Sequence, residues 1–123
     1  MPNEKSVLFV DDEEEILEIL VDLFRDNDYN IFTATAAKQA LDIIYDKPID
    51  FVISDLKLPD RTGVELLEEV KSKRPDAVRV LTSGFLDVQF GEVVESGCDG
   101  TLYISKPWDL SLIKALVCRR LDN

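Results

Sequence analysis

Histidine is absent from the 123 residues of this sequence. The chain therefore has no His-based acid–base catalyst, no His metal ligand and no phosphohistidine of its own. Cysteine is scarce, and the wide separation of Cys98 and Cys118 favours two reduced thiols over a disulfide framework. No segment approaches the ~20 apolar residues of a membrane span, and residues 1–6 lack the apolar stretch of a signal peptide. We therefore expect a cytoplasmic protein.

Positive charge is also scarce. Lys and Arg total 14 and Asp and Glu total 25, so the formal net charge is 14 − 25 = −11. Such a surface repels phosphate backbones and anionic lipids, so neither nucleic acid nor a membrane is an expected partner. Hydrophobic residues still make up 46% of the chain, and no repeat or Gly/Ser-rich linker divides it. We expect residues 1–123 to form a single domain.

Short apolar runs alternate with amphipathic stretches along the whole chain. The apolar runs predict strands at 7–10, 29–34, 51–54, 78–81 and 102–104. Helical spacing of apolar residues predicts helices at about 13–26, 36–46, 64–73, 87–95 and 109–121. Strands that alternate with helices form a parallel sheet covered on both faces.

The simplest such fold at this length is a doubly wound, flavodoxin-like α/β fold, (βα)5, with a parallel five-stranded sheet of order 2-1-3-4-5. This order makes the first and third strands neighbours, and ligands of such sheets bind beyond the carboxyl ends of the strands. Asp11 and Asp12 follow the first strand, and Asp55 follows the third. The fold therefore predicts that three carboxylates meet.

Each aspartate has a simpler explanation when it is considered alone. Asp12 with Glu15 fits a capping box for the first helix, and Asp55 fits the start of a turn. Together, however, three adjacent carboxylates repel one another unless a cation lies among them. Oxygen ligands with open positions suit Mg²⁺. Ser83 and Lys106 follow the fourth and fifth strands. Three carboxylates with one ammonium sum to −2, which one Mg²⁺ neutralises.

Four segments, in this order along the chain, resemble the receiver domain of two-component response regulators. They are Asp11-Asp12, the run from Asp55 to Gly63 (DLKLPDRTG), Thr82-Ser83-Gly84 and Lys106-Pro107. The resemblance covers nearly the whole chain. It implies a Mg²⁺-dependent switch that accepts a phosphoryl group from the phosphohistidine of a histidine kinase or phosphotransfer protein.

The resemblance also implies a role for each matching residue. Asp55 corresponds to the phosphoacceptor. The metal ligands are Asp11, Asp12, Asp55 and the backbone carbonyl of Lys57. Lys106 corresponds to the ion partner of Asp55 and of the phosphoryl oxygens. Ser83 corresponds to the switch hydroxyl, with Thr82 as the alternative. Tyr103 corresponds to the switch aromatic, although considered by itself it fits a core residue better.

The same resemblance implies the partners and limits the activity. A downstream output domain or protein would receive the signal. A homodimer would form through the face made by the predicted helix 87–95, the strand 102–104 and the last helix. We expect a phosphoacceptor switch with self-catalysed phosphotransfer and slow autodephosphorylation only.

Two other functions compete with this interpretation. The first is a phosphorylation-independent protein-interaction module of the same fold, against which the intact set of Asp55, Ser83 and Lys106 argues. The second is a phosphatase with an aspartyl nucleophile, but such enzymes carry a second acid two residues later, where this chain has Lys57. The acidic run after the first strand also has the wrong charge for a flavin or nucleotide phosphate loop.

Overall fold

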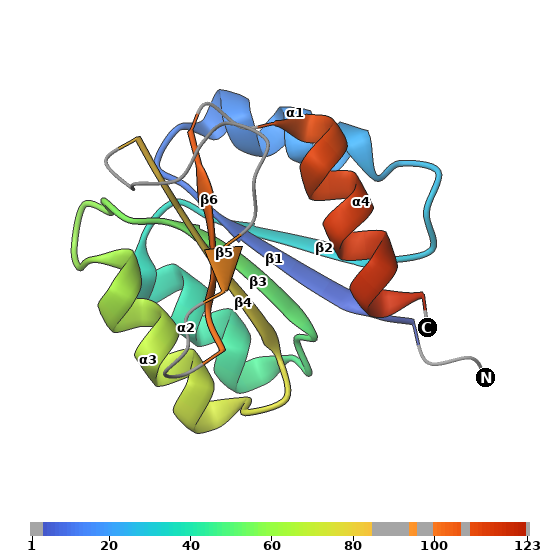
Figure 1. The fold of residues 1–123 in the computed structure, drawn as a ribbon. Helices are drawn as coiled ribbons and strands as arrows, with labels where there is room; N and C mark the ends of the chain where they lie inside the picture. Colours follow the sequence, from blue (N-terminus) through green and yellow to red (C-terminus); the bar gives the residue numbers. More distant parts are fainter. Residues whose placement is uncertain (1–3, 85–93, 96–99, 107–108, 123) are drawn as a thin grey trace.

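The computed structural model describes residues 4–84, 94–95, 100–106 and 109–122. The strands within these residues are β1 (Ser6–Val10), β2 (Asn30–Ala34), β3 (Phe51–Asp55), β4 (Val78–Ser83), β5 (Val94–Glu95) and β6 (Leu102–Ser105). The helices are α1 (Glu14–Leu23), α2 (Ala37–Asp46), α3 (Gly63–Lys73) and α4 (Leu110–Leu121). A central sheet carries α1 and α4 on one face and α2 and α3 on the other (Figure 1).

The strands form one sheet in the order β2-β1-β3-β4-β6-β5. The first five strands in this order pair in parallel. The doubly wound fold with a parallel sheet of order 2-1-3-4-5 is therefore confirmed, β6 being the predicted fifth strand. The order makes β1 and β3 neighbours, so their carboxyl ends open on the same edge of the sheet.

One predicted element is wrong where the structure describes it. We expected a helix at 87–95, but Val94 and Glu95 form β5, which pairs antiparallel with β6. The physical reason is the edge of β6 that faces away from β4. Without β5, the backbone groups on that edge would have no strand partner at Leu102 and Tyr103. Residues 85–93, which hold the rest of the predicted helix, lie outside the described part of the chain.

β1 and β3 are buried on both faces, as a continuous apolar run predicts for a parallel sheet covered by helices. Successive side chains point to opposite faces, so β1 contributes Val7 and Phe9 to one core cluster and Leu8 and Val10 to the other. The first cluster packs under α1 and α4, and the second packs under α2 and α3. These two layers hold the strand ends in place.

The ends of α1 differ from the prediction. The helix begins at Glu14, with Glu13 at the N-cap position and no side-chain capping bond there, so the predicted capping box of Asp12 and Glu15 is wrong. Asp12 is thereby left outside the helix. The helix ends at Leu23 instead of residue 26 because Phe24 bonds to the carbonyl three residues before it, which tightens the last turn.

The other helices begin at recognisable caps. Thr62 and Glu65 form a reciprocal capping box at the start of α3. The side chain of Asp109 caps α4 by accepting from the backbone N–H of Leu112 at 3.1 Å. Ala36 precedes α2 and has no side-chain oxygen, so this helix takes its cap from elsewhere in the chain.

The two cysteines are not both described by the structure. Cys118 is a partly buried free thiol, and Cys98 lies outside the described residues.

Candidate functional site

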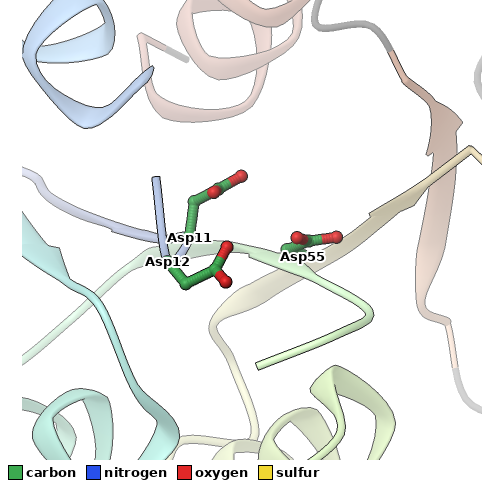
Figure 2. A group of neighbouring side chains, drawn as sticks. All are labelled: Asp11, Asp12 and Asp55. Atoms are coloured by element: carbon green, nitrogen blue, oxygen red, sulfur yellow. The ribbon is translucent and has the colours of Figure 1, made fainter. Parts of the chain in front are cut away.

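Three carboxylates gather where β1 and β3 end. Asp11 and Asp12 directly follow β1, and Asp55 is the last residue of β3. Each offers one oxygen, and these three oxygens lie within 4.8 Å of one another. Figure 2 shows the three side chains arising from these two neighbouring segments. The structure therefore brings together the three acids that the strand order predicted to meet.

Asp11 is the most rigidly held of the three. Its side chain has no exposure to solvent, and its backbone N–H donates to the carbonyl of Ala34 at 3.1 Å. One carboxylate oxygen, Oδ1, accepts from the backbone N–H of Glu13 at 2.8 Å. Asp12, by contrast, is exposed, and Asp55 is nearly buried. The cluster thus combines two fixed, buried acids with one that faces solvent.

Lys106 supplies the positive charge of the site. Its ammonium Nζ lies 3.0 Å from Asp11 Oδ2 and 3.1 Å from Asp55 Oδ2. Its backbone N–H donates to the carbonyl of Ser83 at 3.2 Å, which ties the lysine to the end of β4. Burial lowers the pKa of Lys106, but hydrogen bonds and charge attraction from Asp11 and Asp55 outweigh it and raise that pKa. Lys106 is therefore a fixed cation at this site.

The loop after Asp55 is held tightly against the sheet. The backbone N–H of Leu56 donates to the carbonyl of Thr82 at 2.8 Å, and Gly63 donates to the carbonyl of Leu56 at 2.7 Å. Lys57 and Thr62 form a β-bridge that closes the loop between them. A side chain at position 63 would place its Cβ 2.2 Å from the backbone oxygen of Asp55, so only glycine fits there. These contacts hold the loop in which Lys57 lies, two residues after Asp55.

The two candidate switch hydroxyls lie on opposite faces of β4. Thr82 is opposite Asp55, and its buried hydroxyl lies 3.4 Å from the carbonyl of Ser54, an acceptor on the neighbouring strand. Ser83 is also buried and ends the strand opposite Ser105. Because side chains alternate along a strand, Ser83 shares a face with Leu81, and Thr82 does not.

Tyr103 lies on the same face of the sheet as Ser83. It is opposite Leu81 in the pairing of β4 with β6 and packs, partly buried, against the core cluster under α2 and α3. Ser83 and Tyr103 are therefore diagonal neighbours across two adjacent strands. This placement is compatible both with a core residue and with an aromatic that responds to movement of Ser83.

Sequence reasoning missed three residues around the cluster. Glu13 Oε1 lies 3.9 Å from Lys106 Nζ and adds a fourth acid. The hydroxyl of Ser105 is buried, with no hydrogen-bond partner in the described part of the chain. Asp60 accepts two backbone hydrogen bonds from the start of α2. Of these three residues, only Asp60 could have been found from the sequence, because it lies between Pro59 and Gly63 in the segment from Asp55 to Gly63 that resembles receiver domains.

Comparison with known proteins identifies the family to which this fold belongs. The family model described as the response regulator receiver domain matches residues 7–118, which include every element of the site. The chain belongs to this family. Receiver domains are phosphoacceptor switches and not conventional enzymes, and they bind Mg²⁺ at an acidic pocket. In this receiver domain the acidic group is Asp11, Asp12 and Asp55.

Solved structures and a curated relative agree with this assignment. The signal receiver domain of an HD domain-containing protein from Pseudomonas fluorescens Pf-5 superposes with a TM-score of 0.80 at 27% identity, covering 99% of this chain and 90% of that one. A CheY-like receiver domain protein from Methanospirillum hungatei JF-1 gives a TM-score of 0.80 at 26% identity, covering 98% and 95%.

The curated relative is the hydrogenase transcriptional regulatory protein HoxA of Cupriavidus necator. It is 33% identical over 105 residues, a match that covers 84% of this chain. The receiver chain spans only 21% of that relative's length. Among the described residues, no helix combines the length and the apolar character needed to cross a bilayer.

Proposed function

We propose that this receiver domain accepts a phosphoryl group on Asp55 from the phosphohistidine of a histidine kinase or phosphotransfer protein. The observation that carries the proposal is the position of the Asp55 carboxylate, beside Lys106 at 3.1 Å and within 4.8 Å of the other two acids. The donor histidine must come from a partner, because this chain has none. In the reaction, a carboxylate oxygen of Asp55 forms a bond to phosphorus while the P–N bond of the phosphohistidine breaks.

The residues around Asp55 fit Mg²⁺. The donors are carboxylate oxygens, the type that Mg²⁺ prefers, and one of the acids is open to solvent. Asp11, Asp12, Asp55 and the backbone carbonyl of Lys57 would hold the ion. When bound, Mg²⁺ supplies charge neutralisation for the phosphoryl oxygens.

Lys106 supports the same step from the protein side. It is held by Asp11 and Asp55 before any donor arrives, so its ammonium needs no rearrangement to meet an incoming phosphoryl oxygen. With the three acids it leaves a formal charge of −2, which a divalent cation cancels. An anionic donor then approaches without net repulsion. We expect hydrolysis of the product to be slow and self-catalysed.

Phosphorylation would change a surface through Ser83 and Tyr103. The new phosphoryl oxygens would attract the hydroxyl of Ser83, and movement of that side chain would leave space on the face that Tyr103 shares. The change is a shift in population between two packings of one fold. We propose that an output domain, a partner protein or a second copy binds at the side of the molecule formed by β6 and α4, where β6 carries Tyr103.

The proposal extends to the domain unit, its location and its partners. We take residues 1–123 as one receiver unit, which acts in the cytoplasm together with a kinase. Direct binding of nucleic acid or of a membrane is not proposed, because the net charge of −11 opposes both.

Intact-mass measurement after incubation with Mg²⁺ and a small acyl phosphate tests the proposal. We expect the mass of one phosphoryl group to be added, and hydroxylamine, which cleaves acyl phosphates, to remove it. Asp55→Asn should abolish the addition, whereas Asp42→Asn, a change of the same charge on an exposed helix face, should not. Failure of the wild type to gain the group would favour the phosphorylation-independent interaction module. Full labelling of the Asp55 variant would contradict the assignment of Asp55 as the acceptor.

A further inference from the structure

The first turn of α2 is capped by a residue from a distant loop. The backbone N–H of Ala37 donates to Asp60 Oδ1 and that of Lys38 donates to Asp60 Oδ2, both at 2.9 Å. The preceding residue, Ala36, has no side-chain oxygen with which to cap the helix. These two bonds lower the pKa of Asp60, because they favour its ionised form. One carboxylate therefore joins α2 to the loop 56–62.

That loop begins at the phosphoacceptor. Leu56, the residue after Asp55, is bonded through its N–H to Thr82 and through its carbonyl to Gly63. The bridge between Lys57 and Thr62 closes the loop across its base. Asp60 lies at its far side, where it meets α2. The loop is thus anchored to the sheet at its base and to α2 through Asp60.

The strand that precedes α2 contacts Asp11, the first of the three acids. Asp11 donates its N–H to the carbonyl of Ala34, the last residue of β2, shortly before α2 begins at Ala37. Asp11 is therefore connected to β2, and the chain continues from β2 into α2. The first turn of α2 contacts Asp60, and the loop that holds Asp60 also holds Lys57 and follows Asp55 directly. Among these contacts, the two hydrogen bonds that Asp60 accepts are made by a side chain, and they join two segments that are far apart in sequence.

We infer that Asp60 is a positioning residue for the metal pocket. By holding α2 to the loop, it fixes the backbone of Lys57 relative to Asp11 and Asp55 without contacting the ion itself. The inference rests on the proposed function, since Lys57 is there assigned as a backbone ligand of Mg²⁺. Groups that orient ligands in this way commonly change metal affinity by roughly 10–100-fold when they are removed.

Isothermal titration of the metal-free protein with MgCl₂ tests this role. Asp60→Ala removes both acceptors and should weaken Mg²⁺ binding by about tenfold. Asp60→Asn keeps one acceptor oxygen and should give a smaller loss. In phosphoryl uptake from a small acyl phosphate, the half-saturating Mg²⁺ concentration should rise by the same factor, while the rate at saturating Mg²⁺ stays unchanged.

Asp50 offers a matched control. Its Oδ2 accepts from the backbone N–H of Ser6 at 2.8 Å and joins two distant segments at the opposite end of the sheet. Asp50→Ala removes the same type of bond and the same charge, and Asp50→Asn removes the same charge, so both should leave Mg²⁺ affinity unchanged. Equal weakening by the Asp50 variants would show a general effect of stability and overturn the inference.

The titration also separates this inference from the proposed function. If the wild type binds no Mg²⁺, the proposed function is wrong and the inference falls with it. If the wild type binds Mg²⁺ and folded Asp60→Ala binds it equally well, the inference alone is overturned. Should Asp60→Ala fail to fold, Asp60→Asn decides the question by the same comparison.

Discussion

At the scale of single residues, Lys106 is the group on which the others depend. Its ammonium joins two carboxylates from different strands, and one of them, Asp11, is wholly buried. A buried carboxylate without a partner is costly, so Asp11 is tolerated because Lys106 and the N–H of Glu13 both contact it. Asp11 therefore has its partners before any metal binds.

Ser105 carries one of the two buried side-chain oxygens that lack a hydrogen-bond partner among the described residues. Such a group costs roughly 1–3 kcal/mol, so Ser105→Ala should raise the free energy of unfolding by about 1 kcal/mol. Urea denaturation of the two proteins measures the difference.

Ser54→Ala is the matched control for that measurement. The Ser54 hydroxyl is also buried, but it donates to the backbone oxygen of Asp55 at 2.9 Å. Its removal should lower the free energy of unfolding by about 1 kcal/mol. A loss of stability in Ser105→Ala comparable to that in Ser54→Ala would mean that the Ser105 hydroxyl has a partner after all.

At the scale of elements, the contact between α3 and β3 is set by one glycine. Gly63 starts α3 directly over the end of β3, where an added Cβ would lie 2.2 Å from the Asp55 backbone oxygen and 2.8 Å from Leu81 Cδ1. Gly63→Ala must therefore push the helix away from the strand. We expect a loss of roughly 1–3 kcal/mol in the free energy of unfolding, measured by urea denaturation.

Gly84 provides the comparison for that substitution. It follows β4, and a Cβ there would meet no atom within 4 Å. Gly84→Ala should therefore change the free energy of unfolding by less than about 0.5 kcal/mol. Equal effects at the two glycines would show that backbone entropy, and not the contact of α3 with β3, determines the result at position 63.

At the scale of the whole molecule, stability is concentrated in the centre of the sheet. All residues of β1 and β3 are buried, and each of these strands contributes to both core clusters. β2 lies at one edge and is mostly only partly buried. The acids of the site are thus attached to the two most protected strands.

Native-state hydrogen exchange should show this gradient. Amides of β1 and β3 should exchange only on global unfolding, whereas those of β2 that face the open edge should exchange more than about tenfold faster. NMR or mass spectrometry after proteolysis measures the rates. Equal protection of β1 and β2 would indicate that β2 is covered in solution, for example by a second copy of the chain.

The alternation of apolar runs and amphipathic stretches was enough to predict most of the fold. Val7 to Val10 is apolar without interruption and is followed by two aspartates, so both the buried strand and the position of the acids followed from local pattern. The prediction was wrong at Val94 and Glu95, where pairing with the edge of β6 decided the backbone. It was also wrong about the cap of α1.

The sequence alone thus determined the order of the elements, the layers and the strand ends at which the acids lie. The tertiary structure decided which side chains meet: Lys106 with Asp11, 95 residues apart, and Asp60 with the start of α2, 22 and 23 residues apart. The physical reason is that periodicity records which face of an element is buried. A hydrogen bond between distant segments depends on distances that only the packed chain fixes.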